Sequence, residues 1–114
     1  MRLLIVDDHA AMRRLLGRVV EDLFSAVEEC DDGADALDAY ARHRPDWVFM
    51  DIEMSRTDGL TATRDIVLAF PDAKVLIVSK HDDEQLRAAA HTAGARGYVL
   101  KENLIAVREL LGRR

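Results

Sequence analysis

Short apolar runs with no polar residue inside them constrain the fold of this chain most. They are residues 3–6 (LLIV), 47–50 (WVFM), 75–78 (VLIV) and 98–100 (YVL). A strand with one face in water alternates apolar and polar residues, so an unbroken run indicates a strand buried on both faces. Such strands are typical of parallel sheets covered by helices. Residues 25–30 (SAVEEC) mix apolar and charged residues instead and predict a half-buried fifth strand.

Segments with helical periodicity separate these strands. In the first, residues 9–24, the apolar positions predicted to face the core are Met12, Leu15, Leu16, Val19 and Leu23. The others are residues 33–43, 58–70, 82–94 and 103–112. Five strands alternating with five helices predict an α/β fold, a single doubly wound five-stranded parallel sheet with helices on both faces.

Composition limits the organisation and the function classes. A chain of 114 residues without a repeat or linker predicts one domain over residues 1–114. The net charge of -5 gives no reason to expect nucleic-acid binding. No run is long enough to span a membrane or to form a secretory signal, so no membrane partner is expected. The single cysteine, Cys30, fits a cytoplasmic location.

Polar residues directly follow the predicted strands. Asp51, for example, follows the run 47–50 with no turn residue between. Ligand sites of open α/β sheets form outside the carboxyl ends of the strands, near the topological switch point. One acidic residue at a strand end is more often solvated than functional, but several together indicate a shared site. The residues that follow the runs are Asp7, Asp8, Asp51, Ser79, Lys80 and Lys101.

The charges of these residues predict their chemistry. Asp7, Asp8 and Asp51 would repel one another without a counter-ion, and Mg²⁺ is a hard cation that prefers oxygen ligands. Aspartate is a nucleophile toward phosphoryl groups, and a metal with Lys101 would neutralise the incoming oxygens. We therefore expect a Mg²⁺ site at which Asp51 accepts a phosphoryl group and Ser79 donates a hydrogen bond.

The ordered motifs of the chain resemble a known family along almost its full length. They are LLIVDD (3–8), VFMDIEM (48–54) with DG (58–59), VLIVS (75–79) and GYVLK (97–101). Together they resemble the response-regulator receiver domains of bacterial two-component signalling. The motifs VDDH and GYVLK are most similar to the NarL/FixJ-type branch, whose members usually carry a DNA-binding helix-turn-helix domain.

The resemblance implies a flavodoxin-like fold and roles for individual residues. Asp51 would receive the phosphoryl group, and Lys101 would contact it. Asp7 and Asp8 would bind Mg²⁺ together with Asp51 and the backbone carbonyl of Glu53. The remaining implied residues are Ser79 and Tyr98, as a switch pair.

The implied partners are a histidine kinase or phosphotransfer protein and, after phosphorylation, a second copy of the chain. The domain would be a signalling switch that could take part in regulating transcription. It would not be an enzyme beyond catalysing its own phosphorylation and dephosphorylation.

The sequence also departs from the family pattern. Ser55 stands where proline is common, which predicts a looser loop after Asp51. Glu102 follows Lys101 where the family often has proline, and Lys80 stands where a small residue is usual. None of these changes removes a group of the expected site.

Three other function classes fit the sequence less well, and the histidines are not expected to bind a metal. A pseudo-receiver that only binds partners would not need the acidic pair, Asp51 and Lys101. A haloacid-dehalogenase-type phosphatase would place its nucleophile after the first strand, and a flavin binder would need a phosphate-binding loop there. The four histidines, His9, His43, His81 and His91, show no metal-ligand spacing and are expected on the surface, with His81 near the site.

Overall fold

A computed structural model describes residues 1–112 of the chain. The strands are β1 (Arg2–Val6), β2 (Ala26–Cys30), β3 (Trp47–Met50), β4 (Val75–Ser79) and β5 (Gly97–Leu100). The helices are α1 (Ala10–Val19), the 3₁₀ turn η1 (Gly33–Asp35), α2 (Ala36–His43), α3 (Gly59–Ala69), α4 (Glu84–Ala93) and α5 (Ile105–Leu111). All five predicted strands and all five predicted helices are present.

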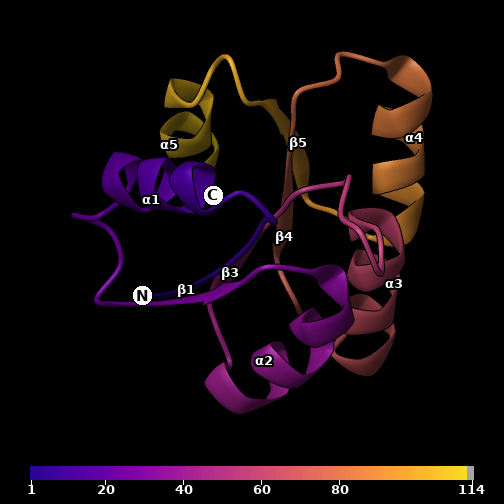
Figure 1. Ribbon diagram of the computed structural model, residues 1–114, viewed down its shortest axis with the longest axis horizontal. Coiled ribbons are helices and arrows are strands. Elements are labelled where there is room, and N and C mark those ends of the chain that lie inside the picture. Colours follow the sequence, from indigo (N-terminus) through magenta and orange to yellow (C-terminus); the bar gives the residue numbers. More distant parts are fainter. Residues whose placement is uncertain (113–114) are drawn as a thin grey trace.

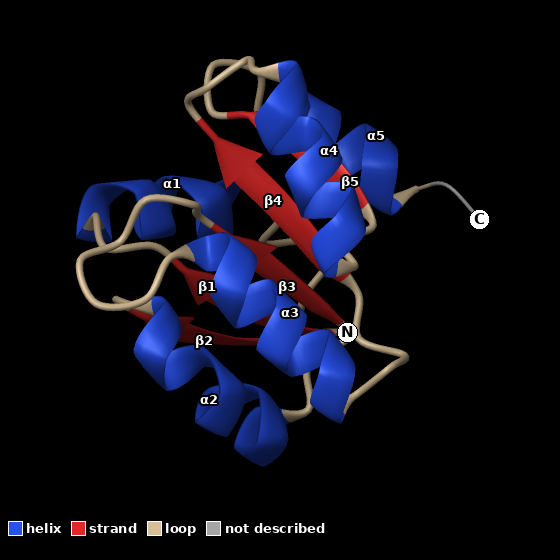
Figure 2. Ribbon diagram, turned by 90° about the vertical axis from the view of Figure 1, so that its right-hand side faces the viewer, coloured by secondary structure: helices blue, strands red, loops and turns tan. Residues whose placement is uncertain are grey.

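The strands form one parallel sheet in the order β2-β1-β3-β4-β5. The order reverses direction between β1 and β3, which makes this the topological switch point. Helices α1 and α5 cover one face of the sheet, and α2, α3 and α4 cover the other (Figures 1 and 2). The predicted doubly wound α/β architecture is therefore confirmed.

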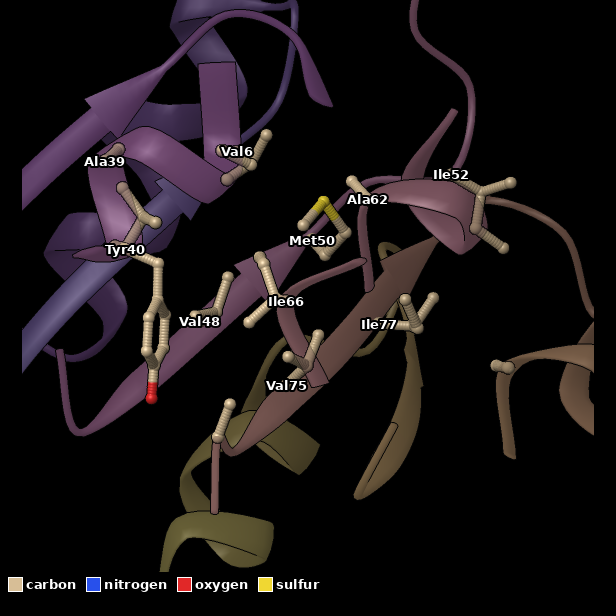
Figure 3. Close-up of a cluster of buried hydrophobic side chains, with 14 residues drawn as sticks. Val6, Ala39, Tyr40, Val48, Met50, Ile52, Ala62, Ile66, Val75 and Ile77 are labelled. Atoms are coloured by element: carbon tan, nitrogen blue, oxygen red, sulfur yellow. The ribbon is translucent and has the colours of Figure 1, made fainter. Parts of the chain in front are cut away.

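Each face of the sheet has its own apolar core because successive strand side chains point to opposite faces. Val48, Met50, Val75 and Ile77 pack under α2, α3 and α4, as Figure 3 shows. Leu3, Ile5, Phe49 and their neighbours pack under α1 and α5. The unbroken apolar runs thus reflect strands with helices on both sides.

Two predictions about burial are wrong. Leu15 was expected in the core, but it is 45% exposed, and the adjacent Leu16 alone turns fully inward. His43 was expected on the surface, but its side chain is only 12% exposed because α2 ends against β2, where His43 lies near Glu28. His9 and His91 are exposed as predicted.

Local hydrogen bonds explain where the helices begin and end. Asp58 and Asp83 cap α3 and α4 by accepting backbone N–H groups in the first turn. Gly94 ends α4 with φ 104°, a left-handed conformation that glycine adopts without strain. The helix predicted from residue 33 begins as η1, where Asp32 accepts the N–H of Ala34. Among residues 1–112, no helix is long and apolar enough to cross a membrane.

Candidate functional site

The register of the sheet brings the predicted site residues to one edge. Val6 of β1 lies opposite Met50 of β3, so Asp7 and Asp51 leave neighbouring strands side by side. The N–H of Asp51 donates to the carbonyl of Val6 at 2.9 Å. On the other side, the N–H of Lys101 donates to the carbonyl of Ser79 at 2.8 Å. We call this the carboxyl edge of the sheet.

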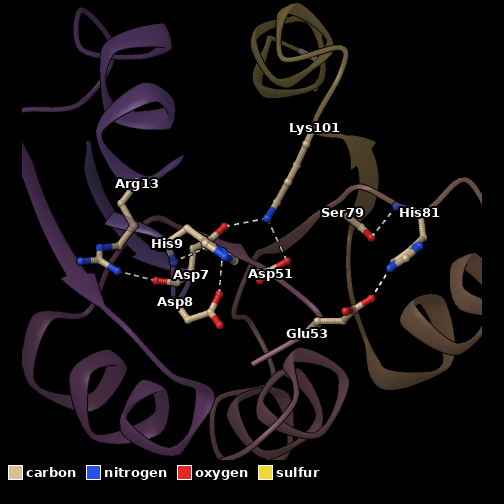
Figure 4. Close-up of polar contacts among 9 residues, drawn as sticks. All are labelled: Asp7, Asp8, His9, Arg13, Asp51, Glu53, Ser79, His81 and Lys101. Atoms are coloured by element: carbon tan, nitrogen blue, oxygen red, sulfur yellow. Dashed lines mark hydrogen bonds and ion pairs between the residues drawn. The ribbon is translucent and has the colours of Figure 1, made fainter. Parts of the chain in front are cut away.

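Lys101 joins two buried carboxylates at the carboxyl edge (Figure 4). Its Nζ lies 3.0 Å from Oδ2 of Asp7 and 3.2 Å from Oδ1 of Asp51. The side chains of Asp7 and Asp51 are 2% and 7% exposed, and that of Lys101 is 14% exposed. All peptide bonds in residues 1–112 are trans, so Lys101 reaches both carboxylates with a trans bond to Glu102.

The pKa values reflect an excess of negative charge. Burial raises the pKa of Asp51, and the charge of Asp7 raises it further, while Lys101 only partly offsets both. Burial also opposes the charge of Lys101, but the hydrogen bond to Asp7 and the two carboxylate charges outweigh it and raise the Lys101 pKa. One lysine therefore does not neutralise the carboxylates that surround it.

Asp8 completes a set of groups that fits a divalent cation. Ligand atoms of Asp7, Asp8, His9 and Asp51 lie within 4.8 Å of one another. Nδ1 of His9 lies 2.9 Å from a carboxylate oxygen of Asp8. Carboxylate oxygens, with an adjoining solvent-accessible hollow for waters, match the preference of Mg²⁺. His9 was not among the candidate metal ligands predicted from the sequence, because residue spacing does not show that His9 lies close to Asp51.

Arg13 is a second residue that the sequence did not single out. From α1 its guanidinium donates to the backbone carbonyl of Asp7 at 2.6 Å and to Glu29 of β2 at 2.7 Å. It therefore fixes the end of β1, where two of the three predicted metal-binding aspartates, Asp7 and Asp8, lie. The available sequence signal is its position three residues before Leu16, which places a charged side chain on the same side of α1 as a core residue.

The predicted switch residues meet at His81, not at each other. The hydroxyl of Ser79 accepts the N–H of His81 at 3.1 Å, and the hydroxyl of Tyr98 donates to the carbonyl of His81 at 2.7 Å. The His81 ring contacts the carboxylate of Glu53 (Figure 4). Tyr98 packs against the core beneath α4, with the guanidinium of Arg87 above its ring.

A hollow of about 290 Å³ opens above Asp51. Its lining residues are Asp8, His9, Asp51, Glu53, Met54, Ser55, Ser79, Lys80, His81 and Lys101. The exposed Lys80 stands at its rim, as the sequence predicted. The hollow gives a small phosphate-sized group access to the carboxylate of Asp51.

The loop after Asp51 is held by a residue that sequence reasoning overlooked. The buried carboxylate of Asp32, after β2, accepts the N–H groups of Arg56 and Thr57 at 2.8 and 3.0 Å. Ser55, expected to loosen this loop, donates its hydroxyl to the same carboxylate at 3.3 Å. Asp32 therefore restrains this loop, and the expectation that it is looser than in family members with proline stays a prediction.

Residues 3–111 match the family model described as "Response regulator receiver domain". The chain belongs to this family. It is 39% identical over 103 residues to the transcriptional regulatory protein DegU of Brevibacillus brevis, covering 89% of this chain and 44% of DegU.

Solved receiver structures agree with the fold and with the predicted branch. A LuxR-family two-component response regulator from Aurantimonas sp. SI85-9A1 has a TM-score of 0.85 at 32% identity, over 99% of this chain and 86% of that one. CheY in a complex with CheX, beryllofluoride and Mg²⁺ from Borrelia burgdorferi has a TM-score of 0.91 at 27% identity, over 97% and 86%.

The chain spans about half the length of several curated relatives, such as DegU at 44% and NreC of Staphylococcus carnosus at 48%. What it shares with those regulators is the receiver domain. The further activities of the whole relatives are therefore proposals for this chain.

Proposed function

We propose that this receiver domain is a phosphoacceptor switch in which Asp51 takes a phosphoryl group from a histidine kinase or phosphotransfer protein. One observation carries the proposal. Asp51 is a buried carboxylate that opens into a hollow of about 290 Å³, which has room for a phosphoryl group, and it lies 3.2 Å from Nζ of Lys101. The same 1–114 segment would act as a single domain.

The transfer requires an anionic nucleophile and charge neutralisation. A carboxylate oxygen of Asp51 attacks the phosphorus, and the bond from phosphorus to the donor's histidine nitrogen breaks, leaving its electron pair on that nitrogen. The ammonium group of Lys101 already contacts Asp51, so it can pair with the oxygens of a phosphoryl group bound there. The chain thus catalyses its own modification, and water attack on the acyl phosphate returns it to the starting state.

The donor set at the carboxyl edge supports Mg²⁺ as the cofactor. Asp7, Asp8 and Asp51 would hold it, with the backbone carbonyl of Glu53 as a further ligand. When bound, Mg²⁺ would offset the carboxylate charge that Lys101 leaves uncompensated and the charge of the incoming phosphoryl group. The related Borrelia burgdorferi CheY complex contains Mg²⁺ and beryllofluoride, which supports the same use here.

The contacts of His81 support a route from phosphorylation to the surface. A phosphoryl group adds acceptor oxygens, and turning the Ser79 hydroxyl toward them would remove the acceptor of the His81 N–H. The carbonyl of the same residue holds the Tyr98 hydroxyl. A shift of His81 would therefore move the ring of Tyr98 and the face made by α4, β5 and α5, where Ile105 is 70% exposed.

This face is the proposed docking surface for a partner, including a second phosphorylated copy of the chain. We expect no nucleic acid to bind to the domain itself. Because histidine kinases transfer phosphoryl groups in the cytoplasm, we place the chain there.

Acetyl phosphate with Mg²⁺ tests the phosphoacceptor. Intact-mass spectrometry should detect one added phosphoryl group on the unchanged chain and none on Asp51→Asn, because an amide is not an anionic nucleophile. Asp58→Asn, which changes an exposed acid that caps α3, is the matched control and should still be modified. Modification of Asp51→Asn would identify a different acceptor and reject the proposal.

A second experiment tests the switch. Beryllofluoride, a phosphoryl mimic, should shift the NMR amide signals of Tyr98 and α4 in the unchanged chain. In Ser79→Ala these shifts should be largely lost, while signals next to Asp51 still respond. Equal shifts around Tyr98 in both proteins would show that the coupling does not run through Ser79.

A further inference from the structure

The carboxylate of Asp32 accepts four hydrogen bonds, and three of them come from the loop after Asp51. Its Oδ1 accepts the N–H groups of Ala34 at 2.9 Å and Thr57 at 3.0 Å, and its Oδ2 accepts the N–H of Arg56 at 2.8 Å and the hydroxyl of Ser55 at 3.3 Å. The residue is only 2% exposed. We call Asp32 with residues 55–57 the Asp32 clamp.

The two loops joined by the clamp also touch through their backbones. A Cβ on Gly33 would lie 2.6 Å from the carbonyl oxygen of Thr57, closer than real Cβ atoms approach other atoms. The N–H of Gly59 donates to the carbonyl of Ile52 at 2.8 Å, which closes the loop on itself. The segment from Ile52 to Gly59 is therefore a closed loop whose outer turn rests on Asp32.

This closed loop contains Glu53, whose carbonyl is a proposed Mg²⁺ ligand. A groove of about 250 Å³ connects the clamp with Asp8 at the carboxyl edge of the sheet. Its lining residues are Asp8, Asp31, Asp32, Ser55 and Arg56. The groove thus runs from the loop that carries Glu53 to Asp8, which follows β1. Any relaxation of the clamp moves one proposed ligand relative to the others.

We propose that Asp32 is a positioning residue for Mg²⁺ binding: it holds the loop of residues 52–59 so that the Glu53 carbonyl faces the aspartates. The inference rests on the proposed function, because it concerns the same metal site. Groups that orient metal ligands from behind typically contribute 10- to 100-fold to metal affinity, so loss of the clamp should weaken Mg²⁺ binding roughly tenfold.

The negative charge of Asp32 offers a rival explanation, since a nearby anion attracts a cation without positioning anything. Gly33→Ala separates the two explanations. It forces the loops apart at Thr57 and leaves every charge in place. If position matters, Gly33→Ala should weaken Mg²⁺ binding about as much as Asp32→Ala does.

The test measures the Mg²⁺ dissociation constant by NMR titration of the amide signals of Asp8 and Asp51. The proteins are the unchanged chain, Asp32→Ala, Gly33→Ala and the control Asp58→Ala. Asp58 lies in the same loop and caps α3, and its carboxylate accepts hydrogen bonds from Thr61 and not from the clamp. A thermal melt of each protein fixes a temperature at which all are folded.

Roughly tenfold weaker binding in both Asp32→Ala and Gly33→Ala, with the control unchanged, supports the inference. Unchanged affinity in Asp32→Ala would overturn it. So would an equal loss in Asp58→Ala, which would indicate general loosening, or an unaffected Gly33→Ala, which would indicate charge alone. If the unchanged chain binds no Mg²⁺, the proposed metal site itself is wrong, and the inference fails with it.

Discussion

Asp32 and Asp51 are buried carboxylates at the same edge of the sheet, and their surroundings shift their pKa values in opposite directions. At Asp51, burial and the neighbouring Asp7 raise the pKa. At Asp32, burial acts in the same upward direction, but N–H donors from Ala34, Arg56 and Thr57 outweigh it and lower the pKa to about 2.

The opposite pKa shifts distinguish a carboxylate that stabilises the fold, Asp32, from one that is available for reaction, Asp51. Asp32 has four donors of its own, so its charge is fully solvated by the protein. Asp51 shares one lysine with Asp7 and retains an unfavourable charge. A buried anion in that condition attracts a metal ion or an electrophile, as a phosphoacceptor must.

The largest effect on stability should come from Lys101→Met, which leaves Asp7 and Asp51 buried without their shared cation. Removing one partner of a buried ion pair should lower the free energy of unfolding by about 3 kcal/mol near neutral pH without Mg²⁺. Urea unfolding measures it. Lys80→Met, which changes an exposed lysine at the same edge, is the control and should have little effect.

Acid should reverse much of the Lys101→Met loss. The pKa of Asp51 is raised in the folded chain, so protonation of Asp51 stabilises the folded state. This stabilisation is present at low pH and is lost as the pH rises through the pKa of Asp51 in the folded state. A loss that is independent of pH would mean that packing, and not charge, is the main contribution of Lys101.

Asp32→Ala should have the next largest effect. It removes the clamp and leaves the N–H groups of Arg56 and Thr57 without their acceptor, at a cost of about 2 kcal/mol. Urea unfolding near neutral pH gives this value directly. A negligible loss would show that water replaces the carboxylate without cost.

The stability difference between the unchanged chain and Asp32→Ala should depend on pH in the direction set by the lowered pKa of Asp32. The Asp32 pKa is lowered from 3.8 to about 2, so its stabilisation is present above the unfolded value and is lost as the pH falls through the folded one. The gap between the unchanged chain and Asp32→Ala should therefore narrow from about pH 5 to about pH 2. A constant gap would show that the charge of Asp32 contributes nothing.

Asp51→Asn should act in the opposite direction and increase stability. The ionised Asp51 destabilises the fold at neutral pH, so a neutral amide of similar shape should raise the free energy of unfolding by about 1 kcal/mol without Mg²⁺. Added Mg²⁺ should narrow the gap, because it stabilises the unchanged chain by mass action. Destabilisation by Asp51→Asn would refute the contrast between the two carboxylates.

Glu53→Gln should have the smallest effect on stability. Glu53 contacts His81, but both side chains are substantially exposed, and exposed ion pairs contribute little. The urea midpoint should stay within error of the unchanged chain. A clear drop in the urea midpoint would mean that an exposed carboxylate contributes to stability as much as a buried one.

The fold and most of the site could be predicted from the sequence because both depend on local patterns. The apolar runs 3–6, 47–50 and 75–78 specify strands with helices on both faces, whatever their order in the sheet. A residue directly after a parallel strand lies at the carboxyl edge by geometry alone. Asp7, Asp51 and Lys101 therefore met as expected.

Only the tertiary structure decided the contacts between loops. Strand β1 lies between β2 and β3, but both of these strands lead into helices on the same face of the sheet, α2 and α3. The loops before these helices touch above β1, and this lets Asp32 accept hydrogen bonds from residues 55–57. The chain fold likewise gives Arg13 the carbonyl of Asp7, and links Ser79 to Tyr98 through His81. Sequence periodicity reports the face on which a side chain lies, whereas a hydrogen bond between remote loops also depends on strand order and backbone approach.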